Sequence, residues 1–187
     1  MVEVRNLGLD GVFEIRPPKF EDERGFFSET WNAEQLERFG LSVDFVQDNH
    51  SFSRKRGVMR GLHFQTPPFA QDKLVRVLRG SVFDVAVDIR SGSPTFGRWV
   101  GITLSDKEWN QILVPKGFAH GFVTLEPDTE VVYKVSAQYS QPHDRSIRFD
   151  DPALAIDWPV PAADMKLSAK DAAAPNLADI ETGFAYS

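Results

Sequence analysis

The sequence predicts an all-β protein, either a sandwich, a jelly roll or a barrel, with short helices at its periphery. Two observations support this prediction. The chain contains 15 Phe and gathers Val and Ile in short alternating runs, as half-buried strands do. Turns with Gly and Pro separate these runs at short, regular intervals, which is typical of sandwiches and barrels. With 187 residues and no linker, we expect one domain over residues 1–187.

The clearest strand covers residues 82–89. Its odd-numbered residues, such as Val85 and Val87, share one face, and its even-numbered residues, which include Asp84 and Asp88, share the other. We expect this second face to be exposed, unless Asp84 faces a ligand. Similar strands are expected over 44–52, 57–65, 73–78, 99–104, 111–114, 118–124 and 129–138.

Two short helices are expected outside the strands. The first covers residues 33–39, because Asn32 can cap its amino end, Gln35 follows three residues later and Gly40 can end it. The second lies near residues 168–173. Residues 151–187 begin with a stretch rich in Pro and Asp, and we expect them to form a tail that lies over the barrel.

Charge and composition exclude several classes of function. The chain has 21 Lys and Arg against 27 Asp and Glu, a net charge of −6, which argues against binding to nucleic acid or to an anionic membrane surface. It has no Cys, so disulfides, thiolate metal sites and a Cys nucleophile are excluded. No apolar run approaches the roughly 18 residues of a membrane span, and the first residues do not resemble a signal peptide. We therefore expect a cytoplasmic protein.

Two histidines in apolar strands, His63 and His120, are candidates for acid–base chemistry. An imidazole with a pKa of about 6.5 is suited to removing a carbon-bound proton at neutral pH. Either residue is equally compatible with a hydrogen-bonded position in the core. A base needs a carboxylate to orient it, and the sequence leaves Asp84 and Asp171 as alternatives.

A lysine and a tyrosine are the further candidates for catalysis. Lys73 and Arg76 lie on opposite faces of one expected strand, and we expect Arg76 to reach solvent. An inward Lys73 would stabilise a developing oxyanion. Tyr133 shares a face with two valines, so its phenol is either packed in the core or a neutral acid opposite the histidine.

Arg60 is a candidate phosphate ligand whose orientation depends on a local irregularity. Strict alternation would place Arg60 and His63 on opposite faces of their strand. A bulge at Gly61 would bring both to one face, and otherwise Arg60 points outward. Arg24 and Arg54 have no such context, and an isolated exposed position is the default for both.

Several long motifs carry a resemblance to a known family. They are RGFFSE (24–29), QDNHS (47–51), GVMRGLHFQ (57–65), QDKLVRVLRGSVFDVAVDIR (71–90) and VPKGFAHGF (114–122), in family order. Over nearly the whole chain the sequence resembles the dTDP-4-dehydrorhamnose 3,5-epimerases, which have the cupin jelly-roll fold. The resemblance implies that dTDP-4-dehydro-6-deoxy-D-glucose is epimerised at C3 and C5 to dTDP-4-dehydro-L-rhamnose, through an enolate and without a cofactor.

The resemblance also implies a role for each candidate residue. His63 would be the base, oriented by Asp171, Tyr133 would be the acid on the other face of the sugar, and Lys73 would stabilise the enolate. It implies a homodimer in which the RGFFSE segment crosses to the partner's pocket. Asp144 stands where the family usually has Glu, and Phe149 where Trp is usual. The implied substrate-binding residues are Arg24, Glu29, Gln47, Asp48, Asn49, Arg60, Lys73, His120, Tyr139, Asp144 and Lys170.

The motif with which other cupins bind a metal is incomplete in this sequence. Gly57 and His63 fit its frame, but Gln65 occupies the position of the second His and Lys73 that of the Glu. An ammonium group at a ligand position repels a divalent cation, so we expect no metal. Three alternatives remain: an epimerase that acts at one carbon, a non-catalytic sugar-nucleotide binding module, and a metal-dependent oxygenase, which the two substitutions disfavour.

Overall fold

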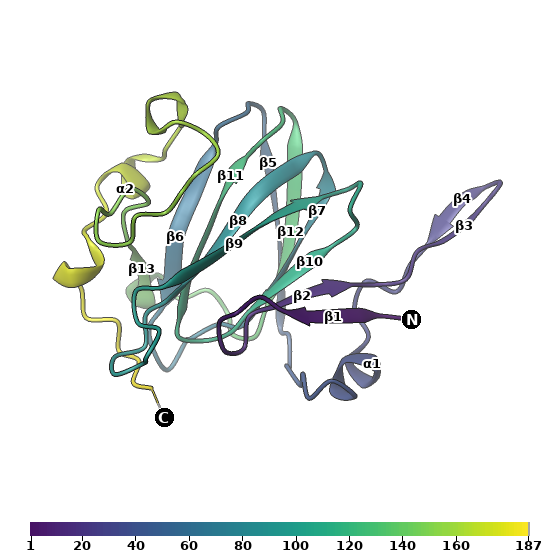
Figure 1. Cartoon of the computed structure of the whole chain (residues 1–187), viewed down its shortest axis with the longest axis horizontal. Helices are drawn as coiled ribbons and strands as arrows, with labels where there is room; N and C mark the ends of the chain where they lie inside the picture. The colour runs from purple at the N-terminus through teal and green to yellow at the C-terminus, as the bar shows by residue number, and fades with distance from the viewer. Residues whose placement is uncertain (187) are drawn as a thin grey trace.

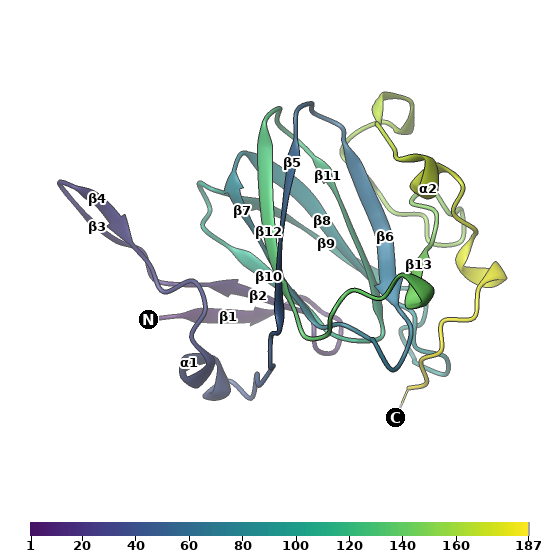
Figure 2. The ribbon, with the colours of Figure 1, turned by 180° about the vertical axis from the view of Figure 1, so that it is seen from behind.

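The computed structural model describes residues 1–186 and shows two antiparallel sheets packed face to face (Figure 1 and, from behind, Figure 2). Across the first sheet the order is β1 (Glu3–Asn6), β2 (Phe13–Arg16), β10 (Gln111–Val114), β7 (Lys73–Arg79), β12 (Thr129–Val135) and β5 (Gln47–Ser53). Across the second it is β13 (Asp144–Ser146), β6 (Met59–Gln65), β11 (Phe118–Thr124), β8 (Ser81–Asp88) and β9 (Trp99–Ser105). The predicted all-β jelly roll is confirmed.

The strands from β5 to β12 alternate repeatedly between the two sheets, so side chains far apart in the sequence face each other across the core. Val75, Ile112 and Val131 of the first sheet pack in one cluster with Val82 and Leu104 of the second. All five side chains are nearly fully buried. This apolar layer fixes the separation of the two sheets, because protein cores are packed at close to crystalline density.

The even-numbered face of β8 is buried, which corrects the expectation of an exposed face. Asp84 and Asp88 are each 0% exposed. β8 lies between β11 and β9, and apolar groups cover both of its faces. Asp84 is paired with His120. Asp88 accepts hydrogen bonds from three side chains, those of Arg90, Ser93 and Thr95, which compensate its loss of water.

Residues 151–186 run along the outer side of the second sheet (Figure 1; Figure 2). Leu154, Trp158 and Leu177 pack against Val85 and Val87 of β8. This segment contains the helix α2 (Ala169–Ala172) and two short 3-10 turns (Ala162–Asp164 and Leu177–Asp179). A third turn (Gln141–His143) precedes β13.

The N-terminal region forms a hairpin that extends away from the barrel in both views (Figure 1; Figure 2). The hairpin consists of β3 (Phe20–Asp22) and β4 (Gly25–Phe27), and Phe20, Phe26 and Phe27 are exposed. The helix α1 (Ala33–Glu37) follows it, with the Asn32 side chain accepting a hydrogen bond from the backbone of Gln35 at 3.1 Å, as the sequence predicts. No helix within residues 1–186 is long and apolar enough to cross a membrane.

Candidate active site

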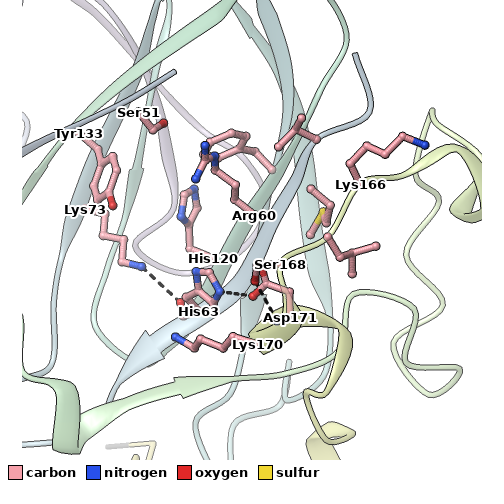
Figure 3. A pocket seen from close by; sticks show the side chains of 14 residues that line it. Ser51, Arg60, His63, Lys73, His120, Tyr133, Lys166, Ser168, Lys170 and Asp171 are labelled. Carbon is pink, nitrogen blue, oxygen red and sulfur yellow. Dashed lines mark hydrogen bonds and ion pairs between the residues drawn. The ribbon is translucent and has the colours of Figure 1, made fainter. Parts of the chain in front are cut away.

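A cavity of about 460 Å³ opens between the two sheets, and the C-terminal segment forms part of its wall (Figure 3). The side chains around it come from β5, β7 and β12 of the first sheet, from β6 and β11 of the second, and from the region of α2. Its polar lining is Ser51, Arg60, His63, Lys73, His120, Tyr133, Lys166, Ser168, Lys170 and Asp171.

A bulge in β6 brings Arg60 and His63 to the same cavity. His63 lies opposite His120 of β11, and Arg60 lies opposite Phe122, so three residue steps on β6 face two on β11. Gly61 has a φ of +128°, and a Cβ there would lie 2.5 Å from the Cα of Gly121. Only glycine fits this approach. The bulge considered from the sequence is therefore present.

His63 is paired with the carboxylate of Asp171, 108 positions further along the chain. The distance from His63 Nε2 to Asp171 Oδ1 is 2.5 Å, and the Ser168 hydroxyl donates to the other carboxylate oxygen at 2.9 Å. Burial raises the pKa of Asp171, but the hydrogen bonds from His63 and Ser168 outweigh burial and lower it. The alternative partner, Asp84, contacts His120 instead, with both oxygens 2.9 Å from Nε2.

Lys73 is the buried cation of the cavity, with 7% of its surface exposed. Its Nζ donates to the backbone carbonyl of His63 at 3.3 Å. Burial lowers the pKa of Lys73 to about 8, although the charges of Asp84 and Asp144 act in the opposite direction. Within residues 1–186 no carboxylate forms an ion pair with Lys73, and a desolvated ammonium group of this kind is well placed to stabilise an anion that forms in the cavity.

Tyr133 lies on the wall of the cavity opposite His63. It belongs to β12, next to the strand that carries Lys73, and Figure 3 shows these two side chains on one side and the His63–Asp171 pair on the other. Burial raises the pKa of Tyr133, so its phenol keeps its proton at neutral pH. The two sheets thus place a neutral proton donor and a carboxylate-bound histidine on facing walls.

A smaller hollow adjoins the cavity and shares His63, Lys73, Tyr133 and Lys170 with it. Its rim is linked by polar contacts: the Tyr139 hydroxyl donates to Asp144 at 3.3 Å, and Lys170 forms an ion pair with the same carboxylate. The residues predicted to bind substrate that line this hollow are Gln47, Asn49, Lys73, Tyr139, Asp144 and Lys170.

Three residues predicted to bind substrate do not face the cavity of their own chain. Arg24 lies on the protruding hairpin, where it pairs with Asp22 at 2.5 Å. Glu29 accepts hydrogen bonds from the side chains that begin α1. Asp48 points to the outer face of the first sheet and pairs with Lys134 at 2.9 Å, because alternation along β5 turns it away from its neighbours at 47 and 49.

The sequence interpretation missed several lining residues. Ser51 continues the inward face that Gln47 and Asn49 define on β5, and the two-residue period contains this signal. Ser168 accepts a hydrogen bond from the backbone of Asp171 at 3.1 Å as the cap of α2, and the Ser-x-x-Asp spacing is a known capping signature. Gln71 lines the hollow and donates to the carbonyl of Ala137 at 2.7 Å.

The positions of the cupin metal motif do not fit a metal in this chain. The Gln65 amide group donates to the carbonyls of Phe69 and Gln138 and accepts from the backbone of Ser140, so it holds a loop. Lys73 brings a cation to the position of the motif's Glu. Among the described residues, no group of three His, Cys, Asp or Glu side chains is arranged to hold a metal ion.

The fold and the cavity define a cupin-type jelly roll whose interior carries acid–base groups where related barrels carry metal ligands. A family model described as dTDP-4-dehydrorhamnose 3,5-epimerase matches residues 6–179. The chain belongs to this family of carbohydrate epimerases, as its sequence motifs indicated.

Individual relatives agree with this assignment. The chain is 50% identical over 182 residues to a dTDP-4-dehydrorhamnose 3,5-epimerase of Sinorhizobium fredii, an alignment that covers 97% of this chain and 93% of the relative. The structure of an epimerase from Legionella pneumophila, in complex with dTDP-4-keto-L-rhamnose, matches with a TM-score of 0.95 at 46% identity and covers 100% of both chains. ChmJ, a 3′-monoepimerase from Streptomyces bikiniensis, matches with a TM-score of 0.84 at 34% identity and covers 92% of this chain and 86% of its own.

Proposed function

We propose that the protein epimerises dTDP-4-dehydro-6-deoxy-D-glucose at both C3 and C5, giving dTDP-4-dehydro-L-rhamnose, by proton transfer alone. The observation that carries this proposal is the facing arrangement of the His63–Asp171 pair and Tyr133 across one cavity, with Lys73 beside them. The similarity to epimerases that act at both carbons supports it.

The chemistry requires these groups because C3 and C5 both flank the C4 ketone. His63 removes the proton from one of these carbons, the electron pair moves to the C4 oxygen, and the charge of Lys73 stabilises the resulting enolate. Tyr133 then returns a proton to the same carbon from the opposite face, which inverts its configuration. Asp171 stabilises the imidazolium form of His63, and both side chains exchange protons with solvent before the next step.

Nucleotide binding is assigned to the rim of the cavity. Arg60 and Lys170 are cations near the candidate catalytic groups, suited to the diphosphate. Tyr139 is exposed at the rim, where its ring is available to stack on thymine. Further rim and floor residues assigned to the substrate are Gln47, Asn49 and His120.

The direct test of this function is NMR spectroscopy of the intact protein with the 4-keto sugar nucleotide in heavy water. Deuterium that appears at both C3 and C5 supports the double epimerase. Deuterium at one carbon identifies a mono-epimerase, which is the second candidate because a 3′-monoepimerase shares the fold. No exchange at either carbon would contradict catalysis and leave a binding module.

Replacing Tyr133 by Phe is expected to separate exchange from inversion. The substitution keeps the ring and removes only the hydroxyl, so His63 still forms the enolate while the proton donor on the opposite wall is lost. We expect deuterium to enter C3 or C5 with configuration retained, at a rate well above that of epimerised product. Normal epimerisation by this variant would exclude Tyr133 as the acid.

A homodimer is expected, in which the hairpin of each chain reaches the cavity of its partner. The hairpin carries Arg24 and exposes Phe26 and Phe27, and apolar side chains on a protruding segment favour burial against another surface. Light scattering should give twice the 21.0 kDa of one chain.

A change in the hairpin gives a sharper test of this assembly. Phe26→Asp should shift the particle toward the monomer mass, and Arg24→Ala should raise KM with the dimer intact. A wild-type particle of 21.0 kDa at micromolar concentration would exclude the dimer.

A further inference from the structure

Helix α2 carries two neighbouring residues that contact two different strands of the second sheet. Asp171 holds His63 on β6 at 2.5 Å. The preceding residue, Lys170, pairs with Asp144 on β13. The side chain that orients the base therefore adjoins a side chain with a separate attachment to the barrel (Figure 3 shows Lys170, Asp171 and His63).

The helix depends on these attachments for its position. It has only four residues, and a helix of this length is not stable by itself. The chain is tied to the barrel through its backbone on either side, by Lys166 to Gly57 and by Pro175 to Arg148. Between these two ties, the side-chain bonds from α2 to the barrel within the described residues are the Asp171–His63 and Lys170–Asp144 pairs.

Asp144 lies on β13, which pairs with β6, the strand that carries His63. In the pairing of β13 with β6, Asp144 lies opposite Gln65 and Ser146 lies opposite His63. The Tyr139 hydroxyl holds the same carboxylate oxygen that Lys170 contacts. The ion pair therefore connects α2 to the strand ladder that positions His63.

We propose that Asp144 is a positioning residue, which acts through Lys170 to keep Asp171 within hydrogen-bond distance of His63. The inference rests on the proposed function of His63 as a base. A carboxylate repels the diphosphate of the expected substrate, so a role in holding Lys170 suits Asp144 better than direct contact with the phosphates. Ion pairs with this degree of exposure are weak, and the expected effect is moderate.

The experiment compares Asp144→Asn with Asp150→Asn as a matched control. Asp150 forms a similar ion pair with Arg148 at 2.7 Å, but neither residue belongs to α2. For Asp144→Asn we expect kcat to fall roughly 2- to 5-fold. In the free protein, the downfield proton resonance of the His63–Asp171 bond should weaken, and the amides of residues 171–173 should exchange faster. Asp150→Asn should change none of these, and Asp144→Glu should preserve them.

The outcomes separate this inference from the proposed function. A raised KM with unchanged kcat, resonance and amide exchange would show that Asp144 binds substrate directly and would overturn the inference. The resonance and the amide exchange are measured without substrate. They therefore test the positioning role even if the wild-type protein exchanges no deuterium into the sugar.

Discussion

Replacing His63 by Ala is expected to abolish deuterium exchange at both C3 and C5. Removal of a positioned base costs about 10²–10⁴-fold in rate, which corresponds to roughly 3–5 kcal/mol in the activation barrier. Both carbons should be affected, because both protons are acidified by the same C4 ketone and His63, the proposed base, is held against a buried carboxylate. The measurement is deuterium incorporation at each carbon, followed by NMR under single-turnover conditions.

A second histidine supplies the control for this experiment. His50 also contacts a carboxylate, that of Glu130 at 3.0 Å, but it lies on the outer face of the first sheet. The His50→Ala variant should incorporate deuterium at both C3 and C5 at nearly the wild-type rate. Near-normal turnover of His63→Ala, or loss at only one carbon, would show that another group removes at least one of the protons.

Replacing Lys73 by Met is expected to lower activity and raise stability at the same time. Loss of the cation that we propose stabilises the enolate should cost about 10²–10³-fold in kcat. The free energy of unfolding at pH 7 should rise by up to roughly 3 kcal/mol, because burial holds the pKa of Lys73 near 8 rather than 10.5. Methionine has a similar length and no charge to desolvate. Denaturant unfolding and turnover assays of the two proteins test both effects.

The pH dependence follows from the direction of this pKa shift. The unfolded chain keeps the Lys73 proton up to about pH 10.5 and the folded chain only up to about pH 8. The cost of the buried charge is therefore fully present below pH 8 and fades between pH 8 and 10.5. The stability gain of Lys73→Met should fade over the same range. Wild-type kcat/KM should decline above about pH 8, and a flat profile to pH 10 would place the functional cation elsewhere.

The longer strands of the barrel could be predicted from local pattern, whereas the shortest strands could not. The predicted strands 111–114 and 118–124 have the observed bounds, because each has an apolar run between clear turn residues. The strands β3, β4 and β13 have three residues each, which is too short to show the alternation of apolar and polar residues that marks a strand. The predicted strand 129–138 ends at Val135, where the chain leaves the sheet.

The pairing of groups in the cavity depends on contacts that no local pattern records. His63 and Asp171 are 108 positions apart, so the sequence left two carboxylates as equal candidates. The sequence predicts exposure for Asp84 and Asp88, because the residues that cover their face of β8, such as Ile112 and Val131 of the first sheet, are distant in the sequence. The bulge at Gly61 could be predicted, since a glycine inside a strand is a local signal of a bulge.

The facing walls of the cavity have a consequence for how such a protein changes over time. Tyr133 and His63, the proposed proton donor and acceptor, lie on separate sheets, which pack about 10 Å apart. The distance between them therefore depends on the side chains that fill the interior. Substitutions of Val75, Val131 or Leu104 change the volume of that filling without changing any charge, and Tyr133 packs against the same cluster. Substitutions in this apolar layer can therefore change which sugar carbon lies within reach of both Tyr133 and His63. The stereochemical outcome of the proposed reaction would then evolve through the volume of apolar side chains rather than through charge.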